Sequence, residues 1–488
     1  MTLQDYANGF AGDELAGQME LQKAMQAGQI TGRDTTNQAL TMEPLKAESL
    51  EKTLKLLEFR TQDIKLWNAI PKLTAYNTVE EFLQLVSYGT QRGGFYGEGE
   101  LSDVEDSVYT RRAEKVKYMQ VTGEVTMQAQ MVNSFVDAMR KEVENKMMWI
   151  LRLANNSLTK ADSDIVSHEF NSFYKQHASI GVGTDFLYAT FEDYYNQDIV
   201  IDLRGASIKQ ADVEQGAVVG DLHFCTVDTL FAPTTVISAL ARDYYNDQRI
   251  LLNGDSAFRG VIGTVPKTIA TTMGDIALMT DKGMQADPAK TLANSSTSTK
   301  APAAPASVAV SAVSDTTSKY TSGEAGNVFY AVSALNSKGE SNLTSHNSSV
   351  AVSAAHATDI TITAGNNGNT ASGYVIYRTK VTTASSPTGL TFYPIFKVST
   401  AQVTAGYNGA SAGVVRDRGY FLPDTEQCFM TQMAEEVMSF KQLAPISKLD
   451  LAIQKMARSF ICFLFGTPQL YAPKKMIRFI NVSKVLTA

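Results

Sequence analysis

The segment "MVNSFVDAMRKEVENKMMWILRLANNSLTK", residues Met131–Lys160, decides the fold more than any other part of the chain. Its apolar residues recur at intervals of three and four, which predicts one long amphipathic helix. At ~1.5 Å per residue the helix would be roughly 45 Å long. A helix of that length is typical of an extended molecule or a helical bundle. The apolar stripe consists of Val132, Phe135, Met139, Val143, Met147, Ile150 and Leu151.

The segment just before this helix, residues 88–125, is rich in glycine and charge. Its composition predicts a long two-stranded excursion with a charged tip. One interpretation is a solvated hairpin that carries both signs of charge. The other is a reaching arm whose charges pair with a neighbouring copy of the chain. The acidic half holds Glu98, Glu100, Asp103, Glu105 and Asp106, and the basic half holds Arg111, Arg112, Lys115 and Lys117.

Towards the N-terminus the pattern predicts a polar arm followed by helices. Residues 1 to about 45 are polar and Gln-rich, and residues 46–59 have leucines at helical spacing. A second short helix, "TQDIKLWNAI", should end at Pro71. The stretch "NTVEEFLQLV" suggests a third helix, with Thr78 as its N-cap and Glu81 completing a capping box.

The part of the chain after the long helix alternates between helical and strand patterns. Residues 170–290 therefore predict a mixed domain with a modest sheet. The same mixed pattern returns after residue 417. There we expect a helix near residues 447–460 and a final strand in "APKKMIRFINV".

Between these mixed parts the composition changes sharply. Residues 291–306, "TLANSSTSTKAPAAPA", have the Ser/Thr and Ala/Pro composition of a linker. From residue 307 to about 415 charges are rare, and short alternating segments such as "VFYAVSALN" and "SGYVIYRT" recur between turn signals. This predicts a separate all-β sandwich inserted into a parent domain.

The overall composition excludes several classes of protein. The chain has 488 residues, 44% of them hydrophobic, and a net charge of -7, which argues against a tight DNA reader. Three scattered cysteines, Cys225, Cys428 and Cys462, indicate a reducing compartment without a disulfide framework. The N-terminus lacks the pattern of a signal peptide, and the run "FICFLF" is too short to cross a bilayer. We therefore expect a soluble protein made in a cytoplasm.

One cluster of residues could carry chemistry. In "DLHFC", a strand would place Asp221, His223 and Cys225 on one face, which suggests a thiol nucleophile or half a metal site. Side chains two apart on a strand project in parallel, however, and do not converge on one atom. The alternative is a partly buried strand whose polar groups are satisfied locally. We expect no enzyme activity, no cofactor and no metal site.

The order of these segments resembles the major capsid proteins of tailed bacteriophages with the HK97-type fold. The chain is similar to that family in its arm ("LEKTLKLLEFRTQDIKLWNAIPKLTAYNTVEEF"), hairpin, long helix, mixed domains and Ala-Pro-basic ending ("GTPQLYAPKKMIRFINV"). The resemblance implies an α+β fold with a spine helix and peripheral and axial domains. Its parts would be an arm (1–75), an extended loop (76–126), the spine and mixed domains (127–299), an inserted sandwich (300–416) and the returning domains (417–488).

The family resemblance implies a structural function. Hexamers and pentamers of the chain would form an icosahedral shell around double-stranded DNA, which is enclosed without sequence-specific binding. Scaffold, portal and decoration proteins would be partners, with no membrane involved. The shell would assemble in the host cytoplasm and become part of the virion. The residues implied for contacts between subunits are Arg111, Arg112, Lys115, Lys117, Glu100 and Asp103.

The inserted module resembles fibronectin-III and immunoglobulin-like domains in "YAVSALNSKGES" and "ASGYVIYRT". Such a module would be displayed on the outer surface. The two segments occur in the reverse of the family's order, so either the module is circularly permuted or one of the two resemblances is accidental. Alternative functions are a tail, baseplate or adhesin subunit with an Ig-like module, and an encapsulin-type nanocompartment shell.

Overall fold

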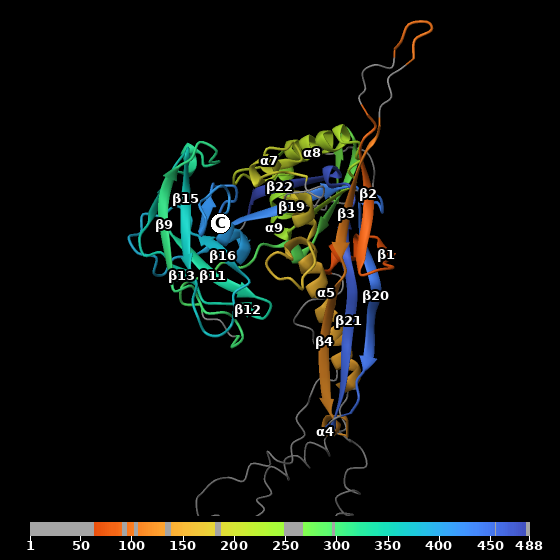
Figure 1. The fold of residues 1–488 in the computed structure, drawn as a ribbon, viewed down its shortest axis with the longest axis vertical. Helices are drawn as coiled ribbons and strands as arrows, with labels where there is room; N and C mark the ends of the chain where they lie inside the picture. The colour runs from red at the N-terminus through yellow and green to blue at the C-terminus, as the bar shows by residue number, and fades with distance from the viewer. Residues whose placement is uncertain are drawn as a thin grey trace, which may run out of the picture. The chain divides into compact units, whose positions relative to one another are not determined.

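The computed structural model describes residues 63–89, 95–101, 106–131, 138–180, 187–247, 267–294, 298–453 and 455–484. All of them belong to one compact unit, Phe59–Ala488. The predicted arm and the helix over residues 46–59 lie outside the described residues. The described part is a mixed α+β structure (Figure 1).

Helix α5 (Ala138–Lys160) lies against a four-stranded sheet of long strands (Figure 1). Its C-terminal half buries Ile150, Ala154 and Leu158 in a core shared with Phe440 and Phe460. The stripe residues Met139, Val143, Met147 and Leu151 are only half-buried. The predicted helix and its apolar face are confirmed for this range, and a short helix, α4 (Met127–Met131), precedes it. Residues 132–137 lie outside the described residues.

The sheet beneath α5 is built from strands that are far apart in the sequence. Its order is β1-β20-β21-β4, and β1 is parallel to β20. Before β1, helix α3 ends at Ala69, just before Pro71, as predicted. The strands are β1 (Lys72–Thr74), β4 (Lys117–Thr126), β20 (Met438–Asp450) and β21 (Ala457–Leu470), and α3 spans Lys65–Ala69.

A second core surrounds a six-stranded sheet of order β5-β22-β19-β6-β8-β7. The final strand β22 lies inside this sheet, which confirms the strand predicted in "APKKMIRFINV". Its strands are β5 (Val200–Asp202), β6 (Thr229–Ala232), β7 (Thr268–Thr271), β8 (Gly274–Thr280), β19 (Thr425–Thr431) and β22 (Met476–Ser483). The associated helices are α6 (Phe173–Ala178), α7 (Phe191–Tyr195), α8 (Gln210–Leu222) and α9 (Thr234–Asp247).

Residues 307–417 form sheets of their own, as the composition predicted. A sheet of order β12-β11-β16-β17, with β13 also paired to β11, faces a three-stranded sheet of order β18-β15-β9. Tyr330, Ile376 and Val398 of the first sheet share one core with Ile360 and Val415 of the second. The strands are β9 (Ser307–Ser314), β10 (Gly326–Val328), β11 (Tyr330–Asn336), β12 (Gly339–Glu340), β13 (Thr344–Ser345), β14 (Val350–Val352), β15 (His356–Thr363), β16 (Gly373–Arg378), β17 (Tyr393–Ser399) and β18 (Val414–Asp417).

The two segments in reversed order prove to be neighbours. Strands β11 and β16 pair antiparallel, with Tyr330 opposite Arg378 and Leu335 opposite Gly373. Their outward side chains are covered as well, by a second apolar cluster that includes Phe329 and Phe392. Burial on both faces fits the runs of apolar residues in these two strands.

A buried ion pair links the end of β16 to the end of β18, where the chain leaves the sandwich. The Arg378 guanidinium lies 2.6 Å from a carboxylate oxygen of Asp417, and both side chains are only 2% exposed. The hydroxyls of Tyr320 and Tyr330 donate to the same oxygen at 3.0 and 2.9 Å. The backbone N–H of Gly419 donates to the other oxygen at 2.8 Å. The buried carboxylate is therefore fully hydrogen-bonded, as a charge in a core must be.

Two helix predictions were wrong. The stretch beginning at Thr78 is strand β2 (Val79–Ser87), and residues 447–460 lie in the hairpin of β20 and β21. In β2 every second residue faces outward, a period of two that the capping-box pattern obscured. In β21, Phe460, Cys462 and Leu464 are buried between two partner strands. A short apolar run fits a helix or a buried strand equally well, so tertiary pairing decided it.

Candidate inter-subunit contact surface

The predicted excursion is a hairpin of β2 (Val79–Ser87) and β3 (Val108–Lys115), which extends away from the long sheet in Figure 1. The strands pair antiparallel, from Val79 opposite Lys115 to Leu85 opposite Tyr109. The register shifts beyond Leu85, at a bulge. Because side chains alternate along a strand, this register sorts the hairpin into an inner and an outer face.

The inner face of the hairpin rests on its own chain. The Phe82 ring meets the Tyr471 ring edge-on, with centroids 4.9 Å apart. Arg112, opposite Phe82, is nearly buried. The Asn171 side chain donates to Glu114 at 3.1 Å, and Lys117, at the start of β4, donates to the Ser167 carbonyl at 2.5 Å. These contacts fix the base of the hairpin to the rest of the chain.

The Glu114 carboxyl, where the hairpin attaches to the rest of the chain, has a strongly shifted pKa. Burial raises its pKa to about 7, and the Asn171 hydrogen bond with the nearby charges of Arg112 and Lys117 only partly opposes that rise. The Asp164 carboxylate adds to it. Glu114 therefore changes its charge near neutral pH at the root of the hairpin.

The outer face of the hairpin is apolar and exposed. Leu83 on β2 is 71% exposed, and Tyr109 on β3 is 64% exposed. The Glu81–Arg111 ion pair lies on this face too, and both of its side chains remain exposed. Exposed apolar strips of this kind are typical of surfaces that bind proteins, membranes or ligands. The apolar residues of this outer strip are Val79, Leu83, Leu85 and Tyr109, and Val86 and Val108 are also exposed at the bulge beyond them.

The tip of the hairpin is exposed as well, in the part that the structure describes. Phe95 and Leu101 have no cover from the described chain. The Glu100 carboxylate accepts a hydrogen bond from the backbone N–H of Gly97 at 3.2 Å. Asp103 lies outside the described residues.

The structure thus separates the residues predicted for subunit contacts into an outward-facing and an inward-facing group. Arg111 and Lys115 lie on the outer face, whereas Arg112 and Lys117 point to their own chain. The apolar outer strip was missed, although the alternation of Leu83 and Leu85 with polar residues was a signal for it.

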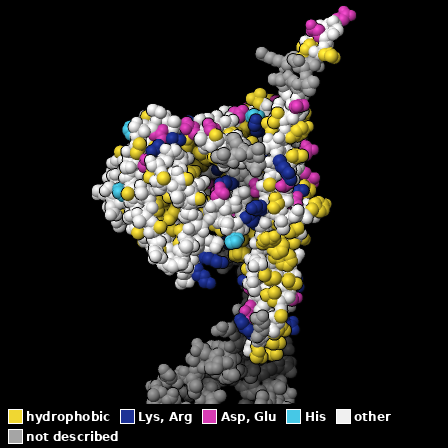
Figure 2. Space-filling view, in the orientation of Figure 1, with side chains coloured by type: hydrophobic (Ala, Val, Ile, Leu, Met, Phe, Trp, Pro, Cys, Tyr) yellow, Lys and Arg dark blue, Asp and Glu magenta, His cyan; other side chains and the backbone are white. Residues whose placement is uncertain are grey.

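Two other places expose apolar side chains. Figure 2 shows hydrophobic side chains gathered along the long strands and at their lower end, where the turn between β20 and β21 meets α4. A smaller group lies at the end of α8, where Phe224 is 90% exposed with a left-handed φ of 57°. The exposed apolar residues of β20, of the turn after it and of α4 are Leu443, Leu449, Leu451, Ile453, Met456 and Met131.

The cluster in "DLHFC" is not on a strand, so that expectation was wrong. Asp221 and Leu222 end helix α8, and His223 is its C-cap. The His223 ring bonds the exposed carboxylate of Asp198 at 2.9 Å. Cys225 is buried, and burial raises the pKa of its thiol, which opposes formation of a nucleophilic thiolate. The three side chains therefore do not share one strand face as the sequence pattern suggested.

Nowhere among the described residues do three His, Cys, Asp or Glu side chains gather as a metal site would require. All three cysteines are free and buried. No helix in the described ranges combines the length and apolar character needed to cross a bilayer.

Along nearly its whole length the chain is similar to a viral coat protein. That relative is described as "Putative major capsid protein" of Enterococcus phage phiEF24C, with 23% identity over 479 residues, 96% of each chain. No protein-family model matches the sequence.

Solved structures of low sequence identity also align with it. The SrpI encapsulin of Synechococcus elongatus PCC 7942 aligns with 6% identity and a TM-score of 0.44, over 91% of this chain and 95% of that one. The capsid of Cyanophage P-SCSP1u aligns with 8% identity and a TM-score of 0.44, over 89% and 92%.

Proposed function

We propose that the chain is the major capsid protein of a tailed bacteriophage, with the HK97-type fold. Copies would assemble into hexamers and pentamers that tile an icosahedral shell around packaged double-stranded DNA. The observation that carries this proposal is the alignment over 96% of both chains with a phage protein of that description. An alignment that includes the β-rich insert and the flanking domains relates the whole architecture rather than one shared module.

The exposed apolar surfaces support an assembling protein. A chain that acts alone rarely leaves a continuous strip such as the one around Leu83 and Tyr109 in water. We infer that a neighbouring copy covers this outer face in the shell. Arg111 and Lys115 would then pair with acids of that copy, and Glu100 would approach it from the tip. Because each contact recurs at every equivalent position, contacts of modest strength are enough to close a shell.

We further propose the roles of the parts. Residues 1–75 would be an arm and 76–126 an extended loop. Residues 127–299 and 417–488 would form the spine, peripheral and axial domains. Residues 300–416 would be an Ig-like module displayed on the outer surface, away from the DNA. Scaffold, portal and decoration proteins would be further partners, and assembly would take place in the host cytoplasm.

Electron microscopy of the purified full-length chain, produced in bacteria, tests the proposal. Closed shells of uniform diameter are the expected result. Rings, trimers or fibres would instead point to a tail, baseplate or adhesin subunit. Shells recovered from infected cells should contain double-stranded DNA. An encapsulin-type compartment would hold protein cargo instead.

A further inference from the structure

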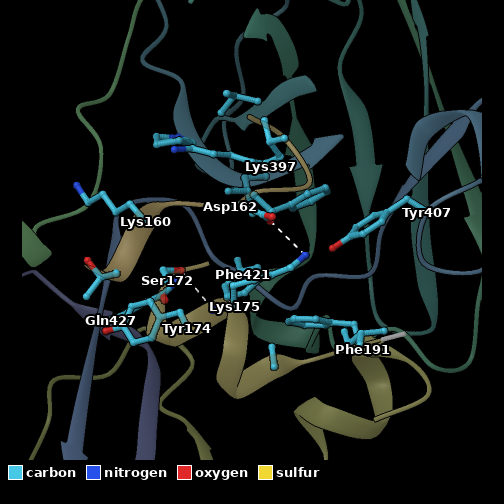
Figure 3. A pocket seen from close by; sticks show the side chains of 18 of the residues that line it. Lys160, Asp162, Ser172, Tyr174, Lys175, Phe191, Lys397, Tyr407, Phe421 and Gln427 are labelled. Carbon is cyan, nitrogen blue, oxygen red and sulfur yellow. Dashed lines mark hydrogen bonds and ion pairs between the residues drawn. The ribbon is translucent and has the colours of Figure 1, made fainter. Parts of the chain in front are cut away.

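A cleft of about 790 Å³ lies between the sandwich and the mixed domains. Residues from α6, α7 and the end of α5 line one wall, and residues from β17 and the following segment line the other. In the view of Figure 3, Tyr407 and Phe191 lie on one side of the Lys175–Asp162 ion pair, and Tyr174 and Gln427 on the other. The size falls within the range of pockets for small molecules, roughly 300–1,000 Å³.

The walls of the cleft are aromatic on both sides. On the sandwich wall, Phe396 and Tyr407 stack with centroids 5.6 Å apart. On the opposite wall, the Phe191 and Phe421 rings are 5.7 Å apart. Paired rings in the lining of the cleft favour an apolar ligand with a flat ring system.

The charges that line the cleft are largely neutralised within the chain. Lys175 pairs with Asp162 at 3.3 Å and with Asp164 at 2.5 Å. Lys160 and Lys397 bind opposite oxygens of Asp287, at 3.0 and 3.1 Å. These side chains need no ligand to balance them.

Two buried hydrogen-bond donors on one wall do lack a partner among the described residues. They are the Tyr174 hydroxyl and the Nε of Arg478. The Arg478 guanidinium lies 4.2 Å from the centre of the Tyr174 ring, so the two side chains are in contact. Its other nitrogens donate to the Tyr194 hydroxyl at 3.1 Å and to Gln427 at 2.5 Å. A buried donor without an acceptor is unfavourable, so this pair is suited to an incoming oxygen.

We propose that the cleft binds a small molecule with an apolar aromatic body and an acceptor oxygen, such as a carboxylate or carbonyl. The ring system would lie between the aromatic walls, and the oxygen would accept hydrogen bonds from Tyr174 and Arg478. Bound there, the molecule would contact the sandwich and the mixed domains at once. It would therefore strengthen the attachment of one to the other.

The test compares two probes, naphthalene-2-carboxylate and naphthalene, by ligand-observed NMR on the full-length chain. Naphthalene-2-carboxylate should bind saturably to the wild type. Tyr174→Phe, which removes only the unpartnered hydroxyl, should weaken that binding about tenfold. Naphthalene has no acceptor oxygen, so its binding should be the same in both proteins. The variant without a probe should melt no lower than the wild type, since it loses no hydrogen bond within the chain.

The matched control is Tyr76→Phe, which alters an exposed tyrosine outside the cleft and should leave both affinities unchanged. Absence of saturable binding to the wild type would overturn the proposal, since ordered water would then suffice to satisfy the two donors. Equal affinity of naphthalene-2-carboxylate for the wild type and Tyr174→Phe would also overturn it. Binding of that kind would come from other exposed apolar surfaces, such as the hairpin.

Discussion

Single residues decide how firmly the sandwich holds together. The Arg378–Asp417 pair is buried and receives two tyrosine hydroxyls. Replacing one partner would leave the other as an uncompensated buried charge, which destabilises by about 3–5 kcal/mol. We therefore expect Arg378→Met to lower the free energy of unfolding by that amount in urea denaturation monitored by near-UV circular dichroism.

An exposed ion pair provides the matched control for this prediction. Lys380, two residues away, pairs with Asp424 at 2.7 Å and is 55% exposed. Lys380→Met should change the free energy of unfolding by less than about 1 kcal/mol. Equal effects of the two substitutions would show that Arg378 is not the buried partner described above.

Glu114 predicts a pH dependence at the base of the hairpin. Its carboxyl pKa is about 7 in the folded chain, against 4.5 ordinarily, because burial disfavours the charge. Between these values the folded state holds a proton that the unfolded state has lost, so stability falls as the pH rises from about 4.5 through 7. Glu114→Gln keeps an amide oxygen for Asn171 and carries no charge. It should match the wild type at pH 5 and melt at a higher temperature at pH 8.

Melting curves at the two pH values check this sign. Glu98→Gln, which alters an exposed carboxylate near the tip, is the control and should follow the wild type at both. A variant at Glu114 that is less stable than the wild type at pH 8 would mean that the charged carboxylate is stabilising instead.

At the scale of elements, the packing of helix α5 is concentrated in its C-terminal half. Leu158 is fully buried, whereas Leu153, on the same helix, is 37% exposed. Leu158→Ala should lower the free energy of unfolding by about 2–5 kcal/mol, because it removes packed atoms and leaves a cavity. Leu153→Ala should lower it by less than about 1 kcal/mol. Urea denaturation of both variants measures the difference, and similar losses would contradict the assignment of the buried face.

The hairpin should matter for assembly and not for folding. Leu83 lies on the exposed outer face, so Leu83→Lys should change the free energy of unfolding by no more than about 0.5 kcal/mol. In a shell, the same lysine would enter an apolar contact without a partner. We expect the variant to remain folded and to form few or no particles in sedimentation velocity. Normal particle yield would argue that no neighbour covers this face.

The sequence predicted elements whose pattern is local and missed those set by distant partners. The helix before Pro71, the buried face of α5 and the strands of the sandwich follow from spacing and turn residues. Strand β21 was read as a helix because a short apolar run fits either element, and its second partner, β4, lies far earlier in the chain. For the proposed contact surface, the sequence indicated the charged residues. The apolar strip could be recognised only from the register of β2 and β3.

For the whole molecule, the insert should be separable from the assembling part. Thr361 of β15 pairs with Ala309 of β9 on one side and Val414 of β18 on the other, so the first and last strands are roughly 10 Å apart. The ends of the deletion lie farther apart, because Lys300 contacts Asn336 and Asp417 contacts Tyr330, at opposite ends of β11. A Gly/Ser bridge of about 20 residues, with a mean span of roughly 25 Å, could replace residues 300–416. We expect electron microscopy to show shells of this variant, with lower thermal stability because the sandwich no longer covers Phe421. Loss of all particles would mean that the insert takes part in the shell contacts.

The most direct test of the central claim is a cryo-electron microscopy reconstruction of particles assembled from the full-length chain. We predict a closed icosahedral shell in which the outer face of the hairpin, around Leu83, Tyr109 and Arg111, lies against a second copy. A shell in which this face stays in solvent, or an assembly with no icosahedral symmetry, would contradict the account.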